Sequence, residues 1–110
     1  MTKIIEIDGK QHTITSNALL PKKYRHQFNR DLIADMKALE DSYSKTGDFD
    51  ETVLARLTWL MLRESGEDVG ETPDEWLGSL ETVFGLYEIL PDVVDLWLRG
   101  TQTTSKPKKK

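Results

Sequence analysis

The chain has 110 residues, of which 37% are hydrophobic and 31% are charged, a balance typical of one small globular domain. Because it contains no cysteine, disulfides and thiolate metal sites are excluded, and no apolar run approaches the roughly 20 residues that a membrane span needs. The net charge is −4, but the last ten residues include four lysines, so residues 1–100 carry −8 and nucleic-acid binding is disfavoured.

Residues 3–15 predict a β-hairpin. Isoleucines precede Asp8-Gly9, and Ile14 lies among threonines after it. Asp-Gly readily adopts the positive φ angles of a type I′ turn and is a strong signal for a two-residue hairpin connection. A lone hairpin is unstable in water, so we expect it to pack against the rest of the chain.

An amphipathic helix is predicted over about residues 21–44. Pro21 suits the first turn, where its missing N–H is not needed. Apolar side chains then recur at steps of three and four, at Tyr24, Phe28, Leu32, Met36, Leu39 and Tyr43. This helix is expected to end at Gly47.

A second helix is predicted over residues 51–65, with Asp50 as its N-cap. This segment is apolar on nearly all sides, because Trp59 and Leu62 point away from its main apolar face. Such a helix is either central in the fold or covered on one side by a partner.

A third helix is predicted over residues 73–90, and its start is marked by a capping box of Thr72 and Glu75. Pro91 is expected to end or kink this helix, since proline blocks an interior helical hydrogen bond. A short final helix is predicted over residues 92–99.

These elements predict an α+β fold, mainly helical, with an N-terminal β-hairpin followed by three to four helices. Residues 1–100 form the single domain, and the polar, lysine-rich tail of residues 101–110 is expected to be disordered.

The sequence contains no recognisable catalytic or metal-binding motif. His12 and His26 lie on different predicted elements, and the nucleotide-binding glycine motifs and the GxSxG and HExxH patterns are missing. The acidic loop at residues 67–75 lacks the ligand order of a calcium loop. We therefore expect no enzymatic activity, no cofactor and no metal.

Three tryptophans in a chain of this size are the informative surplus. Either all three belong to the core, or one or two line a partner groove, where tryptophan buries a large area at low entropic cost. The best candidates for partner binding are Trp59 with Leu62 and Trp97 with Leu98, because both pairs lie on helices with apolar residues on more than one side.

Several short motifs occur in a fixed order along the chain. The hairpin sequence IEIDGK is followed by YRHQFNRDL at residues 24–32, LTWLMLRES at residues 57–65, DEWL at residues 74–77, and ILP before the last helix. In this order they resemble the tail assembly chaperones of long-tailed, siphovirus-type bacteriophages and prophages of Gram-positive bacteria. The resemblance spans essentially the whole chain, although Asn29 stands where that family usually has glycine.

The resemblance implies a protein that acts in the host cytoplasm and is absent from the virion. It would bind the tape measure protein, keep it soluble, and promote polymerisation of the tail tube protein around it. Many family members are also made in a longer form by ribosomal frameshifting, through which the tube protein would be engaged. The lysine run in residues 106–110 then fits a slip site of adenine-rich codons.

For such a chaperone we expect Trp59, Leu62, Trp97 and Leu98 to anchor a helix of the tape measure protein in a groove. The acidic body would keep the complex dispersed, and self-association through the same faces is a further expectation. The alternative is a small phage-encoded regulator that binds nucleic acid through basic positions of the first helix. The acidic body and the lack of helix-turn-helix spacing disfavour it, so neither nucleic acid nor membrane is an expected partner.

Overall fold

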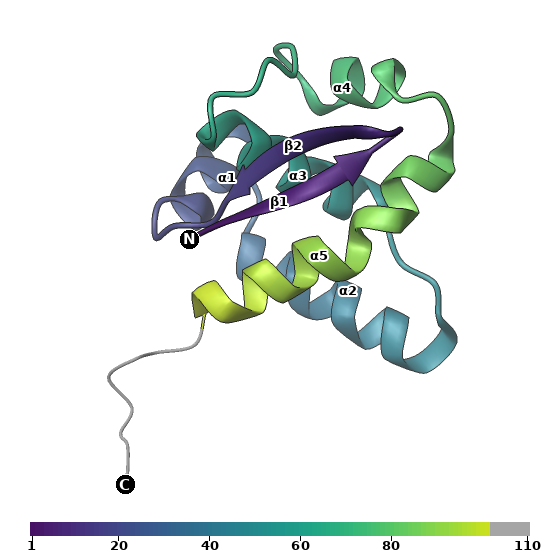
Figure 1. The fold of residues 1–110 in the computed structure, drawn as a ribbon. Coiled ribbons are helices and arrows are strands. Elements are labelled where there is room, and N and C mark those ends of the chain that lie inside the picture. Colours follow the sequence, from purple (N-terminus) through teal and green to yellow (C-terminus); the bar gives the residue numbers. More distant parts are fainter. Residues whose placement is uncertain (102–110) are drawn as a thin grey trace, which may run out of the picture.

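The structure is a computed structural model and describes residues 1–101. An N-terminal hairpin is followed by five helices (Figure 1), with the elements β1 (Thr2–Ile7), β2 (Lys10–Thr15), α1 (Leu20–Phe28), α2 (Leu32–Thr46), α3 (Glu51–Glu64), α4 (Pro73–Ser79) and α5 (Val83–Thr101). The predicted α+β, mainly helical architecture is confirmed. Thr101 is the last residue of α5, and the rest of the tail predicted to be disordered, residues 102–110, lies outside the described residues.

The hairpin forms as predicted. β1 and β2 pair antiparallel with Ile7 opposite Lys10, and both turn residues have positive φ, 52° at Asp8 and 80° at Gly9. One face of the hairpin is apolar and buried, through Ile5 and Ile14 among others. The hairpin lies across the helices, with β2 against α3 and β1 against α5 (Figure 1).

Helix α3 is the centre of the fold. It contacts β2 and all four other helices, and side chains from nearly its whole circumference are buried. Its two-sided apolar character is therefore explained by a central position and does not require a partner.

The helix caps predicted from sequence are confirmed. The Asp50 carboxylate accepts a hydrogen bond from the backbone N–H of Thr52 at 2.9 Å and begins α3. The Thr72 hydroxyl accepts one from the N–H of Glu75 at 3.2 Å and begins α4. The Glu75 carboxylate reaches one residue further back than an ideal capping box, to the N–H of Glu71 at 2.9 Å.

The single helix predicted over residues 21–44 is wrong, because the chain forms two helices there. Asn29 ends α1 in the left-handed conformation, with φ 56° and ψ 41°, and its N–H bonds the carbonyl of Arg25. Asp31 then begins α2, its carboxylate accepting hydrogen bonds from two backbone N–H groups. Asparagine tolerates the left-handed region and aspartate is a good N-cap, so local chemistry overrides the continuous apolar stripe.

The predicted helices over residues 73–90 and 92–99 have the wrong bounds, and the expectation that Pro91 ends a helix is contradicted. The helical structure is interrupted between Ser79 and Val83. Helix α5 begins at Val83 and continues through Pro91 to Thr101. Proline forfeits one backbone hydrogen bond. Burial of apolar side chains in the turns on either side of it, including Ile89 and Val93, favours the continuous helix.

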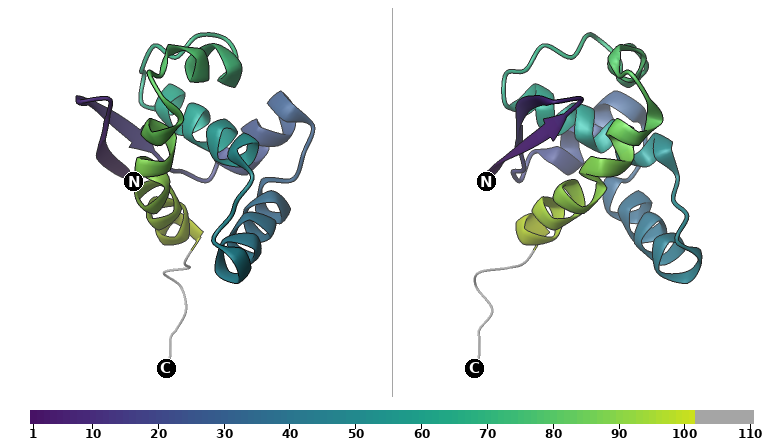
Figure 2. Two further views of the ribbon diagram at one scale, coloured as in Figure 1. Left: turned by 90° about the vertical axis from the view of Figure 1, so that its right-hand side faces the viewer. Right: turned by 45° about the vertical axis from the view of Figure 1, so that its right-hand side comes forward.

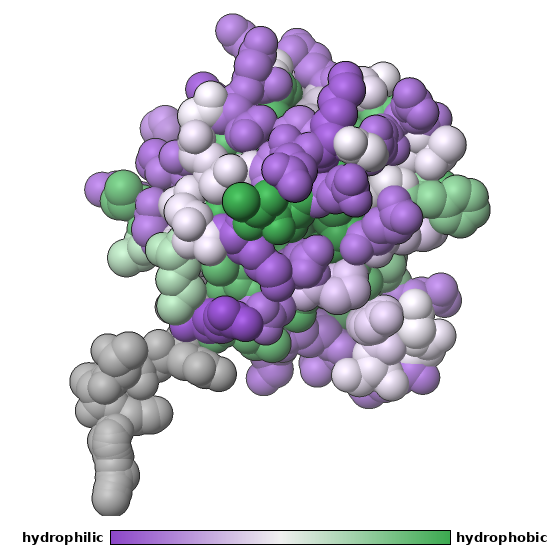
Figure 3. All heavy atoms as spheres, in the orientation of Figure 1, coloured by the Kyte–Doolittle hydropathy of each residue, from purple (hydrophilic) through white to green (hydrophobic). Residues whose placement is uncertain are grey.

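The candidate site lies between helices α2 and α5. Helix α2 and the second half of α5 extend to the same side of the molecule, below the hairpin and α3, and face each other across a gap (Figure 2). On the face of the molecule shown in Figure 3, hydrophilic side chains predominate and hydrophobic ones form small separate patches.

Candidate functional site

Three of the four predicted anchor residues lie in the core. The side chains of Trp59 and Leu62 are fully buried and that of Trp97 is 6% exposed, whereas Leu98 is 42% exposed. The expectation that Trp59, Leu62 and Trp97 anchor a partner helix is therefore wrong for this structure, and the alternative that all three tryptophans belong to the core holds. Only Leu98 is accessible to a partner in this conformation.

Trp59 uses its polar and aromatic groups inside the protein. Its indole N–H donates a hydrogen bond to the carbonyl oxygen of Val69 at 3.3 Å, and its ring meets Phe28 edge to face. The guanidinium of Arg63 lies 4.9 Å from the ring centroid, within the range of a cation–π contact. These contacts make Trp59 a structural residue that ties α3 to α1 and to the following loop.

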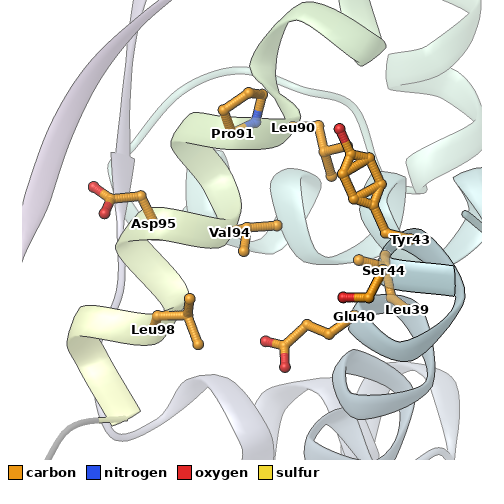
Figure 4. Close-up of a pocket in the computed structure, with 9 residues that line it drawn as sticks. All are labelled: Leu39, Glu40, Tyr43, Ser44, Leu90, Pro91, Val94, Asp95 and Leu98. Carbon is orange, nitrogen blue, oxygen red and sulfur yellow. The ribbon is translucent and has the colours of Figure 1, made fainter. Parts of the chain in front are cut away.

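Leu98 instead points into a groove between α2 and α5 (Figure 4). The groove has a volume of about 400 Å³. It is lined by Leu39, Glu40, Tyr43, Ser44, Leu90, Pro91, Val94, Asp95 and Leu98.

Helical spacing produces the two walls of the groove. Leu39 and Tyr43 lie one turn apart on α2, and Leu90, Val94 and Leu98 follow one another at steps of four on α5. Each helix therefore presents an apolar stripe to the other across the open space. In Figure 4 the side chains of Val94 and Leu98 project toward α2.

The groove joins the hydrophobic core at its floor and is open at its rim. Leu39 and Leu90 are buried, while Tyr43 is 48% exposed and Leu98 is exposed on the opposite wall. Large apolar side chains exposed on both sides of a depression are the pattern of a docking site more than of a sealed core.

An aromatic row extends the groove along the surface. Tyr43 packs edge to face on Phe49 with ring centroids 6.2 Å apart, Phe49 on Tyr87 at 5.3 Å, and Tyr87 on Phe84 at 6.2 Å. The Tyr87 hydroxyl donates to Glu51 at 3.1 Å, and this bond raises the pKa of Tyr87. The row, Tyr43, Phe49, Tyr87 and Phe84, leads from the groove to the N-terminal end of α5.

One rim of the groove is held by ion pairs. Asp95 bonds Lys3 at 3.2 Å and Arg99 at 3.1 Å, and Lys3 also pairs with Asp92 at 3.0 Å. The Lys3 ammonium, and secondarily Arg99, hold the pKa of Asp95 below its ordinary value. Lys3 thus joins β1 to α5 and fixes the wall that carries Leu98.

Two polar clusters outside the groove, at Asp35 and at His12, have structural roles. Asp35 is 6% exposed and accepts hydrogen bonds from Tyr24 and from Arg30, all at 2.8 Å. His12 and Glu67 are linked at 3.0 Å, which ties β2 to the loop after α3. Within residues 1–101, no group of three potential metal-ligating side chains gathers at one place.

The apolar groove residues of α2 were missed as a site because the sequence predicts them on the apolar face that packs in the core. Leu39 and Tyr43 continue an apolar stripe in which Tyr24, Leu32 and Met36 are buried and Phe28 is half-buried. The sequence feature that could have indicated the groove is the composition of α5, which has more apolar residues than one helical face can hold. Trp97 faces inward and Leu98 outward, so α5 contributes apolar side chains both to the core and to the groove.

No family model, curated protein or solved structure matches the chain. In the described part, residues 1–101, no helix combines the length and the apolar character needed to cross a bilayer. The groove is thus the feature from which a function can be argued.

Proposed function

We propose that the protein is a phage tail assembly chaperone that holds the tape measure protein through the groove between α2 and α5. The observation that carries this proposal is the open apolar groove, with Leu39 and Leu90 at its floor and Tyr43 and Leu98 exposed on its walls. The order of sequence motifs described above supplies the class of partner.

The shape of the groove favours a helical occupant. Two helices that present facing apolar stripes can receive the apolar stripe of a third, as in other helix-in-groove complexes. A tape measure protein is a long helical chain with such stripes, which self-associate when nothing covers them. The anchors in this proposal are Tyr43, Val94 and Leu98, in place of the buried tryptophans.

The charge of the body suits a holding role. Since residues 1–100 carry −8, a complex with an apolar client would remain dispersed by mutual repulsion. The proposal places this activity in the host cytoplasm, before the tail is complete. A frameshifted longer form would recruit the tail tube protein, and the codons of residues 106–110 test this part directly.

The experiment is co-expression with the tape measure protein of the same gene cluster, followed by sedimentation of the lysate. Leu98→Asp and Tyr43→Asp place a charge on each wall of the groove and are expected to send the client to the pellet. Ile33→Asp is the matched control, because Ile33 is a 61% exposed apolar residue on α2 outside the groove. If both groove variants fold and keep the client soluble, the groove is not the client site.

A further inference from the structure

The groove contains a half-buried carboxylate, that of Glu40, of which one oxygen is enclosed and lacks a hydrogen-bond partner. Glu40 lies on α2 between Leu39 and the turn that carries Tyr43, and its carboxylate points into the groove toward α5 (Figure 4). Its Oε1 atom is buried and accepts no hydrogen bond, and Glu40 forms no ion pair within residues 1–101. A carboxylate oxygen in this position is costly unless a donor reaches it.

The other acidic side chain of the groove is already neutralised. Asp95 is held by Lys3 and Arg99 on the opposite wall. Glu40 is therefore the groove carboxylate that remains available to a positive group from outside. A cation from a partner would complete its hydrogen bonds, and charge-assisted bonds of this kind are about twice as strong as neutral ones.

We propose that the groove selects amphipathic helices that carry arginine or lysine beside the apolar stripe, in position to bond the Glu40 carboxylate. This inference rests on the proposed function and names the chemistry of its client segment. The apolar stripe would contact Leu39, Val94 and Leu98, and the basic residue would sit one helical turn along the stripe, over Glu40. Arginine suits the site best, because its planar guanidinium bonds a carboxylate through two N–H groups.

Two other occupants fit the groove less well. A second copy of the chain would bring another strongly acidic body against an acidic groove. The chain's own residues 102–110 contain lysines but no large apolar side chain that would fill the space between the walls.

The test uses the full chain and two synthetic amphipathic peptides with the same leucine stripe. One carries arginine at the positions flanking the stripe and the other carries glutamate there. Affinities are measured by calorimetry at about 0.15 M ionic strength, where long-range charge effects are screened beyond about 8 Å. The protein variants are Glu40→Gln, which removes the charge at nearly constant shape, and Asp41→Asn, which makes the same charge change at an exposed neighbour.

We expect wild type and Asp41→Asn to bind the arginine peptide at least about tenfold more tightly than the glutamate peptide. Glu40→Gln should lose most of that preference. An equal loss in Asp41→Asn would mean that the preference reflects net charge, and the inference would be overturned.

The remaining outcomes separate this inference from the proposed function. If wild type binds both peptides equally and Leu98→Asp abolishes both, the groove is a helix site without charge selection. If wild type binds neither, the groove proposal falls with the inference. Replacing the four tail lysines with serine should leave affinity unchanged, and a tenfold gain that Glu40→Gln abolishes would instead assign Glu40 to the chain's own tail.

Discussion

The carboxylate of Asp8, in the hairpin turn, accepts a hydrogen bond from the backbone N–H of Glu81 at 3.0 Å, across 73 residues of sequence. Glu81 lies just before α5, where backbone N–H groups have no partner inside the helix. Asp8 can approach this closely because residue 85 is glycine. A Cβ atom at this position would lie 3.0 Å from Asp8 Oδ1. The hairpin turn therefore holds the segment just before α5, the helix that forms one wall of the groove.

The first prediction concerns this contact. Asp8→Gly preserves the positive φ of the turn but removes the acceptor, and it should lower the free energy of unfolding by about 1 kcal/mol. Asp8→Asn should keep most of the stability, because an amide oxygen can accept the same bond and asparagine tolerates that φ. Urea denaturation of the three proteins measures the difference. Equal losses in both variants would show that the carboxylate charge matters and the hydrogen bond does not.

This contact also explains why one helix boundary was not predictable from sequence. The pattern from Trp76 to Leu90 is continuously apolar on one side, so periodicity does not mark the break at residues 80–82, and Gly78-Ser79 is only a weak local signal for it. The distant Asp8 bonds the N–H of Glu81 inside this break, next to the local bond from the Ser79 hydroxyl to the carbonyl of Trp76. In contrast, the hairpin turn and the caps at Asp50 and Thr72 depend on neighbouring residues only, and these were predicted correctly.

The second prediction concerns Asn29, which separates α1 from α2 in a left-handed conformation. Asn29→Ala should lower the free energy of unfolding by about 1 kcal/mol, since a Cβ atom without a local hydrogen bond is strained there. Asn29→Gly should be neutral or slightly stabilising. The measurement is chemical denaturation of both variants. A more stable alanine variant would indicate that a single continuous helix is accessible.

The break at Asn29 was signalled in the sequence but by a weak pattern. Asparagine followed two residues later by aspartate is a helix stop and a helix start, and glycine, which the family resemblance places at position 29, has the same left-handed preference. The apolar spacing runs through the break because both helices bury the same side against α3. Periodicity alone therefore cannot separate two helices that share one core face.

The candidate site was predictable only in part, for a reason of packing. Sequence identifies apolar faces but not which of them the fold covers. Trp59 and Leu98 are both off the main stripe of an apolar helix, yet one is enclosed by α1 and the loop after α3 and the other faces an open groove. That difference depends on which segments of the fold pack over each side chain, which is a tertiary property.

The third prediction concerns pH and the buried Asp35. The Arg30 guanidinium, and secondarily the Tyr24 hydroxyl, hold the pKa of Asp35 below its ordinary value. Because the folded-state pKa is the lower one, the ionised carboxylate stabilises the protein above about pH 4, and this contribution disappears as the pH falls through the folded-state value. Asp35→Asn should therefore cost about 1–3 kcal/mol at pH 7 and progressively less below pH 4.

The same network has an alkaline limit. Burial, and then the Asp35 carboxylate, raise the pKa of Tyr24 to about 12. A raised folded-state pKa means that the neutral hydroxyl stabilises the protein below about pH 10 and that this contribution is lost between about pH 10 and 12. Thermal unfolding across both ranges measures the two effects, with Asp41→Asn as an exposed control. A constant gap between wild type and Asp35→Asn from pH 7 to pH 2 would contradict the assigned ion pair.

The fourth prediction separates a core tryptophan from a groove anchor. Trp59→Ala should cost about 3–5 kcal/mol of stability, because it empties a fully buried site and leaves the carbonyl of Val69 without its donor. Leu98→Ala should cost less than about 1 kcal/mol, since much of that side chain is already in water. Client or peptide binding should show the reverse order once each variant is measured well below its melting temperature. Trp59→Phe is the informative intermediate, because it retains most of the packing and should bind as wild type does. If Trp59→Phe folds fully but no longer binds, the partner must contact the Trp59 indole. The groove would then have to open further than the structure shows.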